Sequence, residues 1–466
     1  MKHLMMKTRI NSLLFCCLLP CLMEAQHLFS LQQCREMALE NNKQAAIAGK
    51  TFEKANYEVN TYRAHFFPKF SANGTYLYTT QKMRETIPGG YLPTFVPDAS
   101  GNLVPNIVPG TESAPVFKAY SYMPDMPLEF SLSNTFLGGV QLEQPLYAGG
   151  KIRAAYRMST LGKEMADLNR NLTRAQILVQ TDEAYWNCVK ARELHLSAQQ
   201  YKEVITELLR NVENAQAVGL KQKNDVLKVQ VKWNEAELQI KRAENAIRLS
   251  RMNLCHIIGL PLDTDVAVSA SFPETTDMPL EPIDITHRPE YDILSHQTAL
   301  KKQETKLTRS DFLPQLGLQA NYNYMNGLKL NGEKRVADGA FSALLSLRIP
   351  LFEWGKGVNK VRAARAEEHI SQLQQHDAAE KMTLEAAQAF NALEEAQLEI
   401  RLTARSLEQA EENRILSRNM YEAGMETLAD HLEAQTIWQK ASADFIQAKA
   451  LFQYNKTYYL KAIGKL

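Results

Sequence analysis

The residues with the most definite chemical role in this chain are carboxylates that follow two glycines at the same spacing. Asp225 lies six residues after Gly219, and Asp430 lies six residues after Gly424. A glycine in the left-handed conformation can end a helix, and an aspartate soon after it can cap or open the next one. Glu433 follows Asp430 by three residues, so both side chains share one helix face. Taken alone, the pattern is explained by capping at Asp430 and solvation of Glu433.

Catalytic motifs are absent from the sequence. It contains no G-x-S-x-G, H-E-x-x-H or P-loop pattern. Its ten histidines are scattered, and surface exposure on helices explains His195, His369 and His376. A net charge of +1 with 23% charged residues gives no basic field for nucleic acid. We therefore expect no catalysis, no cofactor, no resident metal and no nucleic-acid partner.

The carboxylates belong to a chain that repeats itself in two registers. An offset of 205 relates seven landmarks in order, so that Pro145, Gly150, Gly219, Asp225, Gln230, Trp233 and Gly259 become Pro350, Gly355, Gly424, Asp430, Gln435, Trp438 and Gly464. An offset of 246 relates Pro68, Tyr76 and Tyr78 to Pro314, Tyr322 and Tyr324. The chain is therefore a tandem duplication. The first copy carries extra residues at about 81–127, rich in Pro and Gly, which we expect to form a loop.

The first residues predict export from the cytoplasm. Basic residues precede the apolar run 13–23, and cleavage after Ala25 would leave Gln26 first. This is typical of a secretory signal peptide, 1–25, and not of a membrane span. Three cysteines within it, Cys16, Cys17 and Cys21, leave lipid attachment open as an alternative.

The rest of the chain divides into two repeats. The first covers 26–260 and the second 287–466, with a Pro-rich linker at 261–286 between them. The mature chain keeps Cys34, Cys188 and Cys255, which are too few and too widely spread to predict a disulfide framework.

No segment after the signal approaches the ~20 apolar residues of a membrane-spanning helix. Four segments, however, alternate apolar and polar residues as strands do. They lie at about 67–80, 131–147, 313–326 and 339–351. A water-soluble sandwich would show the same alternation. Tyrosines gathered at one end of the strands favour a membrane interface. Because four strands cannot close a barrel, membrane strands would require several copies of the chain.

Each strand pair precedes a long helical segment without proline. These segments, 151–218 and 356–423, predict rods of about 100 Å. Apolar residues of the second follow a heptad, typical of coiled coils, at Met382, Ala386, Ala389, Leu393, Ala396, Ile400, Thr403, Leu407 and Ala410. An ordinary helical hairpin would show the same period. The hairpins turn at 219–225 and 424–430, where the carboxylates lie.

In this order, the features resemble the TolC-like outer-membrane efflux proteins over essentially the whole mature chain. The resemblance is carried by the helix at 31–42, the strand starts at 67–70 and 313–316, the glycine-x5-aspartate tips, and the strand-to-helix turns, whose residues are Pro145, Gly149, Gly150, Pro350 and Gly355. It implies a mainly α fold with membrane strands. Three chains would form one 12-stranded β-barrel, four strands per chain, continuous with a long α-helical coiled-coil barrel.

The resemblance also implies a function. The chain would be the outer-membrane export duct of a tripartite efflux or type I secretion system in a Gram-negative bacterium, extending into the periplasm. Its partners would be a periplasmic adaptor, an inner-membrane transporter, outer-membrane lipid and two further copies of itself. A periplasmic coiled-coil scaffold without a pore is the alternative. The exported substrate stays open.

The tips receive roles from the same resemblance. Asp430 and Glu433 of three chains would meet at the periplasmic constriction and favour cations. Tyr421 matches a tyrosine of the family's closed-state restraint. In the family, an arginine two residues after the second-copy glycine pairs with the first-copy aspartate and helps to hold the closed state. This chain has Glu426 at the arginine position and Asp225 at the aspartate position, so that ion pair cannot form here.

We therefore expect nearby Lys221 or Lys223 to hold the closed state. The adaptor would dock on the tip residues Val218, Gly219, Leu220, Ala423, Gly424 and Met425.

Overall fold

The computed structural model describes residues 27–111, 113–269, 271–273 and 283–466. The predicted signal peptide and the linker residues Pro279 and Pro282 lie outside them. The chain forms two compact units. A helical unit holds the described part of Met1–Val59 with Met158–Lys302 and Ala366–Leu466, and a sheet unit holds Asn60–Arg157 with Gln303–Arg365. In the part of the chain described, no helix combines the length and apolar character needed to cross a membrane.

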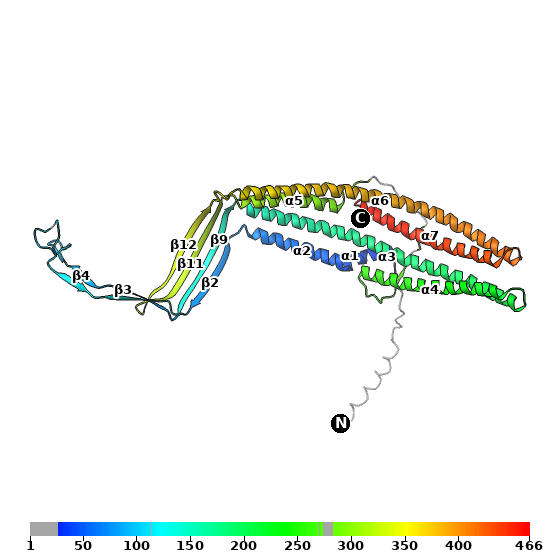
Figure 1. The fold of residues 1–466 in the computed structure, drawn as a ribbon, viewed down its shortest axis with the longest axis horizontal. Coiled ribbons are helices and arrows are strands. Elements are labelled where there is room, and N and C mark those ends of the chain that lie inside the picture. Colours follow the sequence, from blue (N-terminus) through cyan, green and yellow to red (C-terminus); the bar gives the residue numbers. More distant parts are fainter. Residues whose placement is uncertain (1–26, 112, 270, 274–282) are drawn as a thin grey trace, which may run out of the picture. The chain divides into compact units, whose positions relative to one another are not determined.

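The helices are few and long, as the proline-free segments predict (Figure 1). They are α1 Leu31–Asn41, α2 Lys43–Ala64, α3 Lys151–Ala217, α4 Lys223–Ile258, α5 Pro289–Ser310, α6 Lys356–Glu422 and α7 Leu428–Ala462. Both α3 and α6 run for 67 residues without interruption. A capping box between Ser30 and Gln33 starts α1. Two short strands, β1 His27–Phe29 and β10 Val266–Val268, pair in parallel within this unit.

The heptad face of α6 is the face that packs. Six of its nine positions are buried, namely Ala386, Ala389, Leu393, Ala396, Ile400 and Ala410. The first five join a core cluster with Phe452 and Tyr459 of α7. Small residues on α6 therefore let its partner helix approach closely. The cysteines Cys34, Cys188 and Cys255 are buried free thiols, and burial is the main cause that raises the pKa of Cys34 to about 12.

Two hydrogen bonds in the helical unit are related to each other by the two offsets found in the sequence. Asn42 donates its side-chain amide to the carbonyl of Ile257 at 2.9 Å. Arg288, which is 246 residues further along, donates to the carbonyl of Ala462 at 3.3 Å, and Ala462 is 205 residues beyond Ile257. The duplication is thus preserved as a pair of equivalent helix-end contacts.

Four long strands form an antiparallel sheet in the order β2, β9, β11, β12 (Figure 1). Their bounds are β2 Lys69–Leu77, β9 Thr135–Ala148, β11 Gln315–Leu330 and β12 Glu333–Arg348. The last two reach 16 residues each, longer than the sequence pattern predicts. They are joined by Asn331 and Gly332, whose φ angles of 53° and 85° suit a tight hairpin turn.

The insertion at about 81–127 is not the loop we expected. It continues the first hairpin outward through paired strands, namely β3 Lys82–Ile87 with β8 Met126–Ser131, β4 Gly90–Pro93 with β7 Tyr120–Met123, and β5 Phe95–Pro97 with β6 Leu103–Pro105. The expectation was wrong because Pro and Gly here fall largely between or at the ends of short strands, where they interrupt few ladder bonds.

The register gives the long-stranded sheet one apolar and one polar face. Successive apolar rows run across it, such as Ala72, Val140, Tyr322 and Phe341, while the next row holds Ser71, Gln141, Asn321 and Ser342. On the apolar face, Phe70, Val140, Tyr322 and Phe341 are between 52% and 71% exposed. In a soluble sandwich this face would be buried, so the structure does not favour that alternative.

Candidate functional site

The two helical hairpins of the helical unit end in matching turns. Gly219 and Gly424 follow α3 and α6 with φ angles of 83° and 73°. The amide of the next residue, Leu220 or Met425, donates to a carbonyl five residues earlier, at 2.9 and 2.8 Å. These are helix C-caps that need a left-handed residue, a conformation open to glycine without strain.

The turns carry exposed apolar side chains. Val218, Leu220 and Met425 are between 71% and 78% exposed, and Ala423 is exposed beside them. All six residues that the sequence suggests for docking therefore lie at the surface of the two turns.

The returning helices begin with similar first turns. Their N-caps are Gln222 and Thr427, whereas Asp225 and Asp430 are the third residues of α4 and α7. Asp225 accepts a hydrogen bond from the Gln222 amide at 3.3 Å, and Asp430 accepts one from the Thr427 hydroxyl at 2.6 Å. The aspartates thus stabilise the helix starts through their charge and first-turn bonds, and do not occupy the cap position itself.

Asp430 and Glu433 both point to the surface of α7. Each side chain is exposed, while the neighbouring Leu428, His431 and Leu432 are buried on the opposite face. The two carboxylates are therefore available to a common solvent space next to the second tip. Among the described residues, no cluster of three His, Cys, Asp or Glu side chains could hold a metal ion.

Beside the exposed carboxylates lies a set of five residues, here called the tip cluster, which consists of Lys221, Ser417, Tyr421, Glu426 and His431. The ammonium group of Lys221, on the first tip, lies 4.7 Å from the ring centre of Tyr421, on the second hairpin. The other aromatic contact of Tyr421 is a parallel stack with His431, at 5.1 Å between ring centres and 3° between planes. The cluster therefore joins the two tips through a cation–π contact.

A buried hydrogen-bond chain extends from His431. The Ser417 hydroxyl donates to Glu426 at 3.0 Å and lies 3.2 Å from Nδ1 of His431. Because that hydroxyl donates to the carboxylate, it accepts from the ring, so Nδ1 carries the proton of the neutral imidazole. The second oxygen of Glu426 is buried and has no hydrogen-bond partner among the described residues.

Burial is the main influence on the pKa of His431, which is 3% exposed, and it lowers that pKa from its usual value of 6.5. Glu426 and Glu422 act in the opposite direction, whereas Arg414 and Arg418 add to the lowering. The neutral ring is therefore the form that this packing favours.

The structure brings some of the sequence-selected residues together and separates others. Lys221, one of the two lysines considered for the restraint, contacts Tyr421, whereas Lys223 is the first residue of α4. Glu426 bonds Ser417 on its own hairpin, and Asp225 bonds the start of its own helix.

Sequence reasoning missed His431. It lies between Leu428 and Leu432 at core spacing on α7, and that position is a signal that could have identified it as buried.

The strand-to-helix turns of the sheet unit share a backbone path. Gly149 and Gly150 have φ angles of 61° and 88°, following Pro145 by a few residues. In the second copy, Gly355 has 77°, but the position equivalent to Gly149 is Trp354, with a φ of 51°. A side-chain carbon on Gly149 would lie 2.6 Å from the carbonyl oxygen of Ser310, so glycine is required there for close packing as well.

The fold is similar to those of two solved outer-membrane channels. The Campylobacter jejuni outer membrane channel CmeC is 19% identical, with a TM-score of 0.71 over 93% of this chain and 85% of that one. The open state of the Neisseria gonorrhoeae MtrE outer membrane channel is 17% identical, with a TM-score of 0.70 over 93% and 88% of the two chains. At these identities the likeness shows the fold.

Sequence comparison shows the family. The chain is 23% identical to the alkaline protease secretion protein AprF of Pseudomonas aeruginosa over 328 residues, which are 68% of this chain and 67% of AprF. The family described as outer membrane efflux protein matches residues 34–260 and 289–464. These two segments cover both repeats and most of the chain, which therefore belongs to the outer membrane efflux protein family.

Proposed function

We propose that this outer-membrane export protein acts as a homotrimeric duct, in which twelve strands close one barrel and the helices form a tunnel into the periplasm. The proposal depends mainly on the amphipathic sheet of the four long strands, in which β2 and β12 are the two edge strands. Among the described residues, β2 pairs only with β9, and β12 only with β11. In lipid, each unpaired backbone group costs several kcal/mol. Pairing β12 of one copy with β2 of the next removes both edges, and three copies give a closed barrel.

The two faces of the sheet suit the two sides of such a barrel. The exposed apolar rows, with Tyr322 and Phe341, fit lipid. The alternate rows of Ser, Gln and Asn fit a water-filled lumen, because their side chains hydrogen-bond water. The same face carries charges of both signs, at Lys69, Glu143 and Arg348, so neither sign dominates it. A passive conduit for chemically varied cargo is consistent with such a lining.

The tips provide the proposed periplasmic contacts. The exposed apolar residues Val218, Leu220 and Met425 give a periplasmic adaptor an apolar surface, and the adaptor would couple the duct to an inner-membrane transporter that supplies the energy. Asp430 and Glu433 of three chains would form the cation-selective constriction. The tip cluster would restrain that constriction by holding the first tip against the second.

The native mass of protein extracted by detergent from separated inner and outer membranes tests the proposal. We expect a trimer, with a mass near three mature chains, in the outer-membrane fraction alone. A soluble periplasmic monomer or dimer would reject the duct and favour the coiled-coil scaffold.

The constriction is tested on the same trimers in planar bilayers. Asp430→Asn with Glu433→Gln should reduce cation selectivity and block by divalent cations. The matched control is Glu408→Gln with Glu412→Gln, which removes two exposed carboxylates from α6 instead. Equal selectivity in both double variants would reject the assigned constriction.

A further inference from the structure

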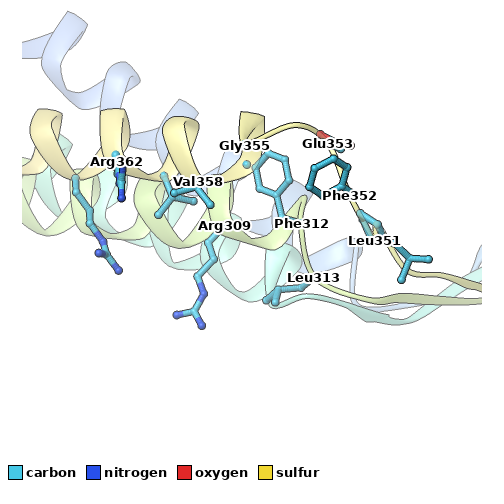
Figure 2. A pocket seen from close by; sticks show the side chains of 13 residues that line it. Arg309, Phe312, Leu313, Leu351, Phe352, Glu353, Gly355, Val358 and Arg362 are labelled. Atoms are coloured by element: carbon cyan, nitrogen blue, oxygen red, sulfur yellow. The ribbon is translucent and has the colours of Figure 1, made fainter.

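An open pocket lies beside the strand-to-helix turn of the second copy, within the sheet unit. It has a volume of about 770 Å³ and is lined by the end of α5, the start of α6 and the turn between β12 and α6. Three arginines contribute to it, Arg309 from α5 and Arg362 and Arg365 from α6. Figure 2 shows Arg309 and Arg362 on the helical side of the pocket, and Leu351 and Phe352 toward the strands.

The pocket is cationic at one end and apolar at the other. All three arginines are exposed, and no carboxylate among the described residues forms an ion pair with any of them. The pocket's own carboxylate, Glu353, pairs instead with Lys356 at 3.5 Å. Leu351 is 90% exposed at the opposite end. Such a pocket fits an anionic molecule with an apolar body.

The turn also holds an exposed tryptophan in an unfavourable backbone conformation. Trp354 has a φ of 51°, in the left-handed region that bulky residues avoid, and is 89% exposed. Its ring contacts Phe352 at 5.0 Å between centres. The first copy has Gly149 at the equivalent position with a φ of 61°, so the fold of the turn does not need an aromatic residue there. The tryptophan is therefore explained better by contact with another molecule than by the folding of this turn.

We propose that this pocket binds the phosphate headgroup of a phospholipid in the inner leaflet of the outer membrane, an inference that rests on the proposed membrane duct. The lipid-facing row of β12 ends with Leu345 and Leu347 and continues into the exposed Ile349 and Leu351. The arginines lie just beyond this apolar path, where lipid headgroups would be. Guanidinium groups bind phosphate through paired hydrogen bonds, and tryptophan prefers the headgroup region.

Native mass spectrometry of the detergent-extracted trimer, titrated with phosphatidylglycerol, tests the site. The variant Arg309→Gln, Arg362→Gln and Arg365→Gln should bind this lipid about tenfold more weakly or worse, because it loses the charge-assisted bonds. The control Arg210→Gln, Arg401→Gln and Arg405→Gln removes three exposed arginines elsewhere and should match wild type within about twofold. Equal weakening in both variants would overturn the site.

Two further arms identify the ligand and the role of the tryptophan. Inorganic phosphate should not displace the lipid, because it lacks the apolar body, and displacement at equal concentration would overturn the lipid assignment. Trp354→Gly should weaken lipid binding while leaving the lipid-free trimer at least as heat-stable, because glycine suits the left-handed position. A trimer structure with a neighbouring subunit filling the pocket would also overturn the proposal.

The same spectra, together with the membrane fraction that contains the protein, separate this inference from the proposed function. A chain that is not trimeric, or not in the outer membrane, would reject the duct. A trimeric outer-membrane protein whose lipid binding is the same in all variants would reject the lipid site alone.

Discussion

Replacing Lys221 with glutamine should loosen the contact between the two helix tips. The Lys221 ammonium group lies 4.7 Å from the Tyr421 ring centre, and both side chains are half-buried. A cation–π contact in such a setting contributes about 1 kcal/mol. Its loss should therefore raise the population of separated tips about fivefold, since 1.4 kcal/mol corresponds to a factor of ten.

Hydrogen exchange measures this population in the detergent-extracted protein. Backbone amides in 212–230 should exchange about fivefold faster in Lys221→Gln, because exchange follows the local opening equilibrium. Lys223→Gln is the matched control, since it removes the same charge two residues away at the start of α4. Lys221→Arg should behave like wild type, because arginine also stacks on tyrosine.

The outcome that would refute this reasoning is equal exchange in the variants at 221 and 223. General loss of positive charge near the tip would then explain both. Faster exchange in Lys221→Arg than in wild type would likewise show that the ring contact is not the stabilising interaction.

Three further predictions concern the same tips. Because burial lowers the pKa of His431, the separated tips bind its proton more readily, so the joined arrangement should be most stable above pH 6.5 and weaken as pH falls toward the lowered pKa. Hydrogen exchange at 212–230, corrected for intrinsic rates, should therefore become faster between pH 7.5 and 5.5 in wild type but not in His431→Gln. Ser417→Val, Glu426→Leu and His431→Val together should stabilise the second hairpin by about 1–3 kcal/mol in thermal unfolding and remove the pH effect, because all three buried polar partners become apolar and no carboxylate is left without its donor; a less stable variant contradicts this. Gly424→Ala should cost about 1–2 kcal/mol through its φ of 73°, whereas Gly162→Ala inside α3 should stabilise slightly; equal effects would show that the turn does not need glycine.

The helical part of the fold could be predicted from the sequence because its signals are local. Absence of proline sets the length of α3 and α6, and glycine marks their ends. The heptad residues of α6 indicate which face packs, and Ala386 and Leu393 are buried accordingly. Family membership, a mainly helical fold with a smaller sheet and an outer-membrane export role are confirmed by the comparisons.

The strands and the tip cluster depend on contacts that local patterns do not contain. Alternation fades after Asn326 in β11, yet the ladder continues because a tight turn at Asn331 keeps both strands paired. The insertion also forms strands because its segments pair with partners far along the chain, as β3 does with β8. Lys221 and Tyr421 are 200 residues apart, so their contact follows from the packing of two hairpins and not from spacing. The sequence shows that both lysines lie near the first tip, but it does not show which of them contacts the second hairpin.

The duplication itself indicates which tip has acquired a special role. At an offset of 205, Ser417 and His431 correspond to Val212 and Val226 of the first copy, and Val212 is fully packed at 1% exposed. The same backbone can therefore close this turn with apolar residues. The second copy instead buries an imidazole, a hydroxyl and a carboxylate oxygen without a hydrogen-bond partner among the described residues.

Buried polar groups of this kind cost stability relative to apolar packing. A cost that falls on one copy, next to Asp430 and Glu433, is expected of a joint that must open, because a weakly stabilised element needs less energy to move. The first tip, with its valines, would then stay fixed. The contact of Lys221 with Tyr421 would join it to the second tip, which would move.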